Sequence, residues 1–349
     1  MRILVLNAGS SSLKVSVVEG LSVIHTADRL PTAPPDGVAA VGHRVVHGGR
    51  RFVEPVVVDR DVERDLEALS ELAPLHQPAA LAVLRQARRL LPAVPHVACF
   101  DTAFHANLPE AAATYALPRQ WRDLGARRYG FHGLSHAWAS RRAADLVPGA
   151  RRVVVCHLGA GASLAAVLDG RSVDTTMGFT PIEGLVMATR SGSVDPGLLL
   201  WLQDREHLSA AEVGDALEHR SGLLGLAGTA DLRDLLERSD DEARLAVDVY
   251  LHRLVGGIAA MAASLGGLEV LVFTGGVGEH APEVRARAAA ALAFLGVAVD
   301  RSRNADAVGD TGQDVDVSED GAAVRTLVVT AREDVEIARA VHHVIERAG

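Results

Sequence analysis

The chain has 349 residues, 48% of them hydrophobic and 23% charged, a composition that excludes a disordered chain and a length that predicts two domains with separate cores. Its net charge of -9 argues against a general nucleic-acid-binding protein, because such proteins need a basic face. The sequence has no signal-peptide pattern and no uninterrupted apolar run of the ~18 residues that span a membrane, so we expect a cytoplasmic protein without a membrane partner.

The first half of the chain is predicted to begin with strands and to continue with helices. In "ILVLNAGSSSLKVSVV", residues 3–18, two apolar runs flank a Gly/Ser-rich turn, which indicates a β-hairpin. The predicted elements are strands near 2–7, 13–18, 39–46 and 52–58, helices at 61–72 and 79–91, and the buried strand "HVACF", which ends at Asp101.

The second half repeats this organisation. In "VVVCHLGAGASLAAVL", residues 153–168, an apolar strand again runs into a small-residue turn and a second strand. The predicted elements are strands at 152–157, 163–168 and 171–174, helices near 195–204, 209–218 and 241–265, the strand "LEVLVFTGG" with a third glycine turn, and a last helix at about 333–347.

Two similar hairpins predict two similar domains. The segment "LVPGARR" at 146–152 breaks the helical pattern just before the second hairpin, which places the boundary near residue 150. We therefore expect two mixed-sheet α/β domains, 1–149 and 150–334, with a cleft between the hairpin tips. The terminal helix, about 335–349, could pack against either domain.

The two cysteines predict neither a disulfide framework nor a zinc site. Cys99 and Cys156 both lie at the ends of predicted strands, a pattern typical of buried thiols and not of a disulfide framework or a zinc site. Reducing surroundings are consistent with that interpretation.

Several residues suggest a phosphate chemistry. Glycine turns after strands let backbone N–H groups approach an anion closely, and Lys14, the single lysine among 35 Lys and Arg residues, follows the first such turn. Arg44 lies between two histidines before a Gly-Gly pair, although it could be a surface residue, and Asp101, which could be a helix N-cap, follows a buried strand. A loop of small residues surrounds Arg190. Guanidinium groups and acids that could hold magnesium are what phosphoryl transfer needs.

Other motifs are open to simpler interpretations. His132 and His136 are spaced like metal ligands, and His76 is a third histidine, but the glycine beside His132 argues against a regular helix and no clear third ligand accompanies the pair. The turn "VFTGGVGEH" and the pair Asp231 and Arg233 could be a turn and a helix cap. No Ser-His-Asp order or nucleophile elbow suggests an acyl-enzyme.

Eight motifs in the same order together resemble the acetate kinase family: "NAGSSSLK", "GHRVVHGG", "FDTAFH", "YGFHGLSH", "HLGAGAS", "MGFTPIEGL…TRSG", "FTGGVGE" and "EDVEIAR". They run from residue 7 to residue 339. The resemblance implies the fold of the acetate and sugar kinase, heat-shock cognate and actin superfamily, in which two ribonuclease H-like domains enclose ATP in an interdomain cleft.

The resemblance also implies roles for individual residues. Asn7 and Glu333 would organise the magnesium side, Arg44 and Arg190 would hold the phosphoryl group and the carboxylate, Asp101 would orient metal or substrate, and His132 and, more weakly, His157 would stabilise equatorial oxygens. The acyl methyl group would meet Val46, Leu75, Phe131 and Pro181. The nucleotide would meet Lys14, His157, Gly159, Gly161, Asp231, Leu232, Arg233, Gly276 and Gly278.

The chain departs from the family pattern at a few positions. Ala160 stands where the family usually has asparagine in "HLGNGAS", His280 where it has the asparagine of "GEN", and Ser193 where an aspartate is common. The stretch between Gly20 and Val38 is also shorter than in the family. These departures concern nucleotide contacts and the periphery more than the chemistry.

The implied reaction is the reversible transfer of the γ-phosphoryl group of ATP to acetate, with Mg²⁺ or, in its place, Mn²⁺, giving acetyl phosphate and ADP without an enzyme nucleophile. A kinase for propionate or another short carboxylate is the near alternative, and a non-kinase ATPase on the same fold is the more distant one. The family resemblance also implies a homodimer whose small-molecule partners are acetate and ATP.

Overall fold

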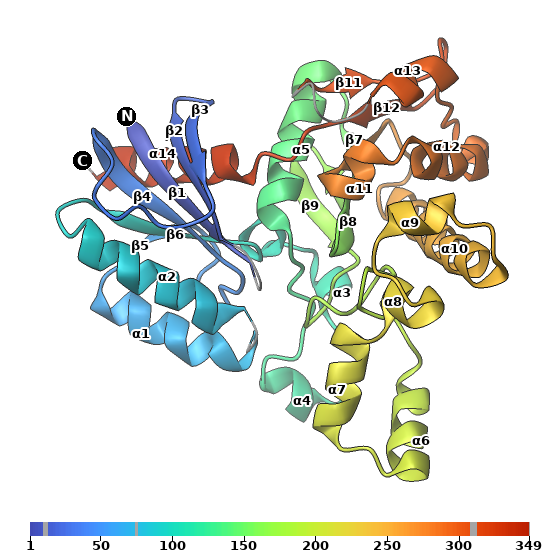
Figure 1. The fold of residues 1–349 in the computed structure, drawn as a ribbon, viewed down its shortest axis with the longest axis horizontal. Coiled ribbons are helices and arrows are strands. Elements are labelled where there is room, and N and C mark those ends of the chain that lie inside the picture. Colours follow the sequence, from blue (N-terminus) through green and yellow to red (C-terminus); the bar gives the residue numbers. More distant parts are fainter. Residues whose placement is uncertain (10–12, 74–75, 308–312, 349) are drawn as a thin grey trace. The chain divides into compact units, whose positions relative to one another are not determined.

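The structure is a computed structural model that describes residues 1–9, 13–73, 76–307 and 313–348. It divides into two compact units (Figure 1). Unit 1 comprises Met1–Ala106, Phe131–Trp138 and Arg332–Gly349, and unit 2 comprises Asn107–Gly130 and Ala139–Ala331. This division differs from the expected boundary near residue 150, because residues 107–130 bond to strands and loops of unit 2, as in the bond from the Tyr129 N–H to the Gly178 carbonyl.

Unit 1 is built on a six-stranded mixed sheet with the order β3-β2-β1-β4-β6-β5. The pairs β3·β2, β2·β1 and β6·β5 are antiparallel, whereas β1·β4 and β4·β6 are parallel. The bounds are Arg2–Ala8 (β1), Leu13–Glu19 (β2), Ser22–Ala27 (β3), Val38–Val45 (β4), Val56–Val57 (β5), His96–Phe100 (β6), Arg60–Ala68 (α1), Gln77–Leu90 (α2) and Glu333–Ala348 (α14).

The period of two along these strands determines which helix each side chain meets. Ile3 and Val5 of β1 pack with Ile337 of α14, whereas Leu4 and Leu6 of the same strand pack with α2. At Gly42 of β4, a Cβ atom would lie 2.5 Å from the Ile337 side chain, so α14 can approach the sheet this closely only where a side chain is missing. The terminal helix thus completes the core of unit 1.

Unit 2 is built on a second six-stranded sheet with the order β11-β12-β10-β7-β8-β9. The strands are Arg152–Leu158 (β7), Ala162–Leu168 (β8), Arg171–Thr175 (β9), Val270–Thr274 (β10), Val315–Asp316 (β11) and Arg325–Val328 (β12). The helices are Glu110–Ala113 (α3), Arg119–Asp123 (α4), Pro196–Glu206 (α6), Ala210–His219 (α7), Gly222–Ala227 (α8), Leu232–Glu237 (α9), Asp241–Ser264 (α10), Gly275–His280 (α11), Pro282–Ala291 (α12) and Arg301–Asp306 (α13). Helix α5 (Gly133–Leu146) contributes residues to both units, and short 3-10 helices occur at Leu69–Glu71, Ala103–His105 and Ala293–Leu295.

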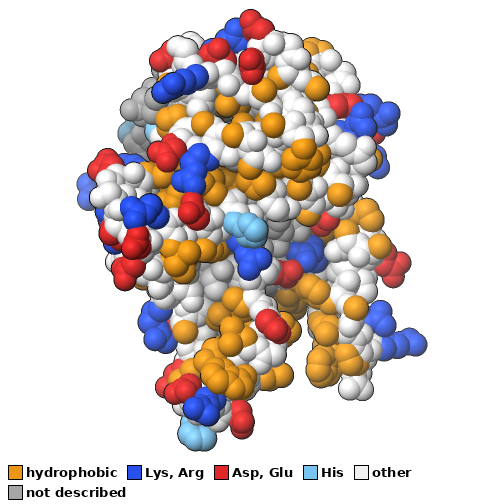
Figure 2. Space-filling model, turned by 90° about the vertical axis from the view of Figure 1, so that its right-hand side faces the viewer, with side chains coloured by type: hydrophobic (Ala, Val, Ile, Leu, Met, Phe, Trp, Pro, Cys, Tyr) orange, Lys and Arg blue, Asp and Glu red, His pale blue; other side chains and the backbone are white. Residues whose placement is uncertain are grey.

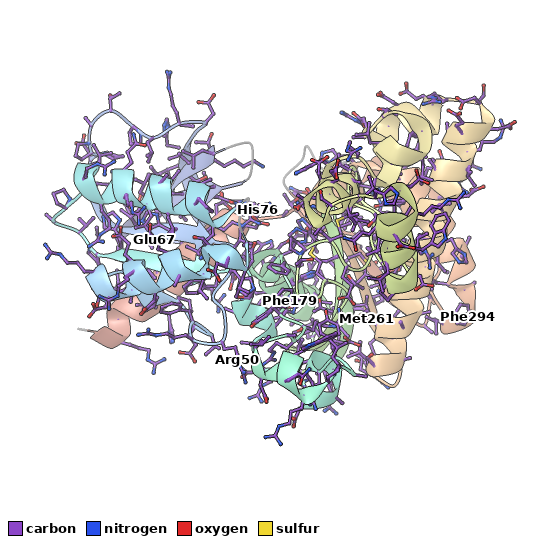
Figure 3. The ribbon with its side chains drawn as sticks, turned by 90° about the horizontal axis from the view of Figure 1, so that it is seen from below. Arg50, Glu67, His76, Phe179, Met261 and Phe294 are labelled. Atoms are coloured by element: carbon purple, nitrogen blue, oxygen red, sulfur yellow. The ribbon has the colours of Figure 1, made fainter. Side chains whose placement is uncertain are left out.

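Helix α10 is the central helix of unit 2. The Asp240 carboxylate caps it by accepting from the Ala243 N–H, and the helix packs against α8, α9 and β8 (Figure 3 labels its Met261). By length and composition α10 could cross a membrane, but nine of its side chains are buried inside the protein, as expected of a core helix.

The two sheets have the same topology. Reading from the antiparallel edge, β3-β2-β1-β4-β6-β5 corresponds strand by strand to β9-β8-β7-β10-β12-β11, with the same sequence of antiparallel and parallel pairs. The predicted duplication is therefore confirmed, and so is the predicted pair of hairpins, β1·β2 and β7·β8. The predicted strand 52–58 is shorter than expected, because only Val56–Val57 pairs with β6.

Candidate active site

Four polar side chains of unit 1 converge at the carboxyl ends of its parallel strands. Arg44 on β4 donates from Nη2 to Asp101 Oδ2 at 2.6 Å and from Nε to both Asp101 oxygens at 3.2 and 3.0 Å. Its Nη1 donates to Asn7 Oδ1 at 3.1 Å, and Asn7 Nδ2 donates to Glu333 Oε2 at 2.7 Å. We call Asn7, Arg44, Asp101 and Glu333 the unit 1 cluster.

The unit 1 cluster is largely shielded from solvent. The Arg44 side chain is 16% exposed, so the interpretation as a surface arginine does not hold. The Asp101 side chain is 1% exposed, and the N-cap of the 3-10 helix that follows it is Thr102, so Asp101 is not a helix N-cap. Burial alone would lower the pKa of Arg44, but Asp101 and Glu333 raise it overall, so the guanidinium stays protonated. Burial raises the pKa of the Asp101 carboxyl, and Arg44 opposes that shift.

His132 lies next to this cluster in a backbone conformation that non-glycine residues rarely adopt. Its φ is +57°, and the following residue, Gly133, donates its N–H to the Asp101 carbonyl at 2.9 Å. A Cβ atom on Gly133 would lie 2.1 Å from that carbonyl oxygen, so the close approach requires glycine. Strained residues of this kind cluster at functional sites.

The sequence-based argument against a regular helix at these histidines is correct for His132 and wrong for His136. Helix α5 begins at Gly133, so His132 immediately precedes the helix and His136 lies within its first turn. Glycine is tolerated there because the helix start lies against the Asp101 backbone. Among the residues that the structure describes, no group of three or more His, Cys, Asp or Glu side chains is placed to hold a metal ion. Cys99 and Cys156 are buried and free, as predicted.

The residues that the resemblance assigns to the acyl group are distributed over both units. Val46 and Phe131 are buried in unit 1, and the Phe131 ring meets the His47 ring edge-on at 5.6 Å. Pro181 belongs to a loop of unit 2. Leu75 lies outside the described residues.

The small-residue loop around Arg190 is a loop in the structure too, without helix or strand from Thr176 to Val194. Arg190 donates from Nη1 to the Pro181 carbonyl at 3.3 Å, and its Nε lies 3.9 Å from Glu218 Oε1. Burial lowers the pKa of Arg190 and Glu218 opposes the shift. Arg190 is therefore partly buried like Arg44, but among the described residues it has no carboxylate partner as close as Asp101 is to Arg44.

A cavity of about 620 Å³ lies within unit 2, and most of the residues predicted to contact the nucleotide line it. Gly159 and Ala160 at the tip of the β7·β8 hairpin form one wall, and α11 forms another. Helix α11 contributes Gly276, Val277 and His280. The remaining lining residues come from the loop around Arg190, from α8, α9 and α10, and from the residues just before α9 and α12: Ala188, Leu223, Ala230, Asp231, Leu232, Arg233, Leu236, Tyr250 and Ala281.

Two departures from the family pattern, Ala160 and His280, both line this cavity. Its other polar residues are Asp231 and Arg233, of which Asp231 caps α9 by accepting from the Arg233 N–H, and Tyr250, whose buried hydroxyl has no hydrogen-bond partner among the described residues. The cavity is apolar with a few polar groups, which is typical of a small-molecule site.

Four predicted nucleotide contacts do not line the cavity. Lys14 lies in unit 1, where it pairs across β1·β2 with Asn7. A Cβ atom on Gly278 would face the Phe273 backbone at 3.3 Å, so that glycine serves packing. Gly161 and His157 belong to the β7·β8 hairpin beside the cavity.

The third glycine turn is the start of a helix. Strand β10 ends at Thr274 and α11 begins at Gly275, whose φ of +80° makes the sharp entry. Glu279 accepts from the Gly275 N–H at 2.9 Å, and the fully buried Arg285 donates to the carbonyls of Gly278 and Glu279, both at 2.8 Å. Sequence reasoning missed this support of the cavity wall, because an arginine on a helix is usually exposed.

The comparisons with known proteins agree with this geometry. The family model described as "Acetokinase family" matches residues 24–339. The acetate kinase of Synechococcus sp. is 43% identical over 406 aligned positions, covering 99% of this chain and 100% of its own. Among solved structures, an acetate kinase from Porphyromonas gingivalis has 34% identity and a TM-score of 0.89 with 99% of both chains covered, and a propionate kinase from Francisella tularensis has 33% identity and a TM-score of 0.89 with 97% and 98% covered. The chain therefore belongs to the acetokinase family.

Proposed function

We propose that the protein is an acetate kinase, which transfers the γ-phosphoryl group of ATP reversibly to acetate and so acts as a phosphotransferase with a carboxylate acceptor. The observation that carries this proposal is the unit 1 cluster, in which Arg44 is buried against Asp101 and joined through Asn7 to Glu333, in a chain of the acetokinase family. A non-kinase ATPase of the same fold would not need this arrangement.

The reaction is a direct in-line transfer. A carboxylate oxygen of acetate forms a bond to the γ-phosphorus, the bond from that phosphorus to the β,γ-bridging oxygen breaks, and the electron pair leaves with ADP. Because the phosphoryl group carries most of its charge on equatorial oxygens, positioned cations supply the catalysis. Arg44 and Arg190 neutralise this charge and hold the carboxylate of acetate. His132, held by its strained backbone beside Asp101, donates to an equatorial oxygen.

The cavity of unit 2 binds the nucleoside part of ATP. Its apolar lining from Leu223, Leu232 and Leu236 suits the faces of a purine, and the charged pair of Asp231 and Arg233 suits the polar ribose. Ala160 and Gly276, which have small or no side chains, leave room for the ligand.

The residues of the unit 1 cluster fit Mg²⁺, and Mn²⁺ as a substitute. Magnesium takes oxygen ligands, usually one or two carboxylates together with substrate phosphates, and Glu333 and Asp101 supply carboxylates within one hydrogen-bonded cluster. When bound, the metal would neutralise phosphate charge. Glu333 would hold it, and the Asn7 amide, fixed between Arg44 and Glu333, orients that carboxylate.

Acetate is proposed as the acceptor in preference to propionate, because the curated relatives at 40–51% identity are named acetate kinases. The family resemblance assigns the contacts with its methyl group to Val46 and Phe131 of unit 1 and to Pro181 of unit 2. An apolar pocket discriminates one methylene by about 1–3 kcal/mol, so the preference is graded rather than absolute.

A homodimer is proposed from the exposed apolar side of α6. This helix has no buried residue, Leu200 is 68% exposed and Trp201 56% exposed. Figure 2 shows hydrophobic side chains near the lower end of this face of unit 2, at the level of α6. A second copy covering this surface would remove it from water.

The family is soluble, and two free cysteines favour a reducing, cytoplasmic location.

One assay separates the candidate functions. The purified protein is given Mg·ATP with acetate, propionate or butyrate in the presence of hydroxylamine, and acyl hydroxamate is measured beside ATP hydrolysis without acceptor. We expect the largest kcat/KM with acetate and little hydrolysis without it. A larger value with propionate would assign the alternative acceptor, and hydrolysis without any hydroxamate would contradict a kinase.

A further inference from the structure

The turn that carries Pro181 is fastened by three side chains that have no role in the proposed mechanism. Tyr115 and Arg128 come from residues 107–130, and Glu183 comes from the loop itself. All three belong to unit 2, as does Phe179, which Figure 3 labels on this loop.

The Tyr115 hydroxyl closes the turn. It accepts from the Phe179 N–H at 2.9 Å and donates to Glu183 Oε2 at 2.5 Å, so one oxygen joins the residues on either side of Pro181. Burial and the Glu183 carboxylate raise the pKa of Tyr115, which keeps the hydroxyl protonated and able to donate.

Arg128 fastens the same turn from its other side. Its Nη2 donates to Glu183 Oε1 at 2.6 Å, and its Nη1 lies 3.0–3.1 Å from the carbonyl oxygens of residues 175, 176 and 177. The guanidinium also lies over the Tyr115 ring, 5.7 Å from its centroid. Both oxygens of the Glu183 carboxylate are therefore used.

The backbone leaves room for this carboxylate. A Cβ atom on Gly178 would lie 1.7 Å from Glu183 Oε2 and 2.2 Å from the Tyr115 hydroxyl oxygen, so only glycine is compatible with the contact. The Gly178 carbonyl accepts from the Tyr129 and Gly130 N–H groups at 3.0 and 3.3 Å, which ties the loop to the same segment through the backbone.

We propose that Glu183 is a positioning residue for the acceptor end of the site. Tyr115 and Arg128 fix its carboxylate, the carboxylate fixes the turn at 179–182, and the Pro181 carbonyl in that turn accepts from Arg190. This inference rests on the proposed function, because it takes Pro181 and Arg190 as acceptor contacts. Loosening the turn weakens the hold on acetate and leaves the separate cavity for the nucleoside intact.

Two variants test the inference. Tyr115→Phe removes one oxygen and with it two hydrogen bonds, and Glu183→Gln keeps the shape of the side chain but removes its charge. We expect each to raise the KM for acetate about tenfold, the value of one hydrogen bond to a charged group, while the KM for ATP changes less than about twofold. The matched control is Tyr129→Phe, whose hydroxyl bonds to the Gly125 carbonyl outside the turn and whose loss leaves both constants unchanged.

The outcomes are distinguishable. No hydroxamate from the wild type with acetate would overturn the proposed function and this inference with it. An active wild type with an unchanged acetate KM in both variants would overturn the inference alone. Acetate and ATP constants that rise together with a lower melting temperature would also overturn it, because Glu183 would then stabilise unit 2 in general.

Discussion

Units 1 and 2 have the same strand topology, but the side chains in their interiors differ in chemical type. The core of unit 1 contains the ion pair of Arg44 and Asp101 and several histidines, among them His47 and His105. Unit 2 contains an apolar cavity at the corresponding hairpin tip. A duplicated fold therefore fixes where a site can form, at the carboxyl ends of the strands, whereas single side chains decide what it binds.

The largest expected effects come from the two partly buried arginines, Arg44 and Arg190. Arg44→Ala and Arg190→Ala each remove a cation from the transferring phosphoryl group and should lower kcat by at least about 10²-fold. Arg44→Ala also leaves Asp101 buried without its partner, which should cost about 3–5 kcal/mol of unfolding free energy.

Arg190→Ala should cost less unfolding free energy than Arg44→Ala, because the Glu218 carboxylate lies 3.9 Å from Arg190 and loses only a weak ion pair. Steady-state kinetics and urea unfolding of both variants check these expectations. Near-wild-type turnover in either variant would refute its assigned role, and equal losses of stability would refute the difference between the two environments.

Acid should destabilise unit 1 before unit 2. Burial lowers the pKa of His47 and of His105 from 6.5 to about 4. Between those values the unfolded chain binds more protons than the folded one, so stability falls as pH drops from 6.5 to 4, by about 3 kcal/mol for each histidine. In unit 2, the shifted Arg285 titrates only at about 10.

A short hydrogen-exchange pulse at fixed pH, applied after equilibration in urea at pH 7 or pH 5, reads out which unit has unfolded. Peptides of unit 1 should show the larger decrease in urea midpoint. Equal decreases in both units would contradict this account of the two cores.

The sequence predicted the parts of the site that depend on local pattern. Alternating apolar strands around glycine turns predicted both hairpins, and residues directly after strands, such as Asp101, reached the expected edge. It could not predict contacts between distant segments, because Tyr115, Arg128 and Glu183 meet through tertiary packing alone. Strands β11 and β12 were missed because they are only two and four residues long, and β3 was missed because its side chains are mostly exposed and show no apolar alternation.

Ala160→Asn should improve nucleotide use. The Ala160 side chain faces the cavity, where an asparagine amide could donate to a phosphate, and the low end of the range for such a bond predicts about a tenfold higher kcat/KM for ATP. Ala160→Leu has the same branched side-chain shape without a donor and is the matched control. An unchanged or lower value in a folded Ala160→Asn variant would show that the cavity has adapted to alanine.

The smallest effect concerns Tyr250. Its side chain is 3% exposed and its hydroxyl has no partner among the described residues, so Tyr250→Phe removes a desolvated polar group. We expect the ligand-free protein to gain about 1 kcal/mol of unfolding free energy. Urea unfolding without nucleotide checks this, and a loss of stability would mean that the hydroxyl is satisfied.

The assignment of the nucleoside to the cavity of unit 2 is tested most directly by calorimetric titration with Mg·ADP. A Cβ atom on Gly276 meets no atom within 4 Å, so Gly276→Leu should fill the cavity of unit 2 without a clash. We predict that Gly276→Leu abolishes ADP binding while Arg44→Ala, despite its loss of turnover, binds ADP within about threefold of the wild type. Normal binding by Gly276→Leu, or loss of binding in folded Arg44→Ala, would contradict the assignment of the nucleoside to unit 2.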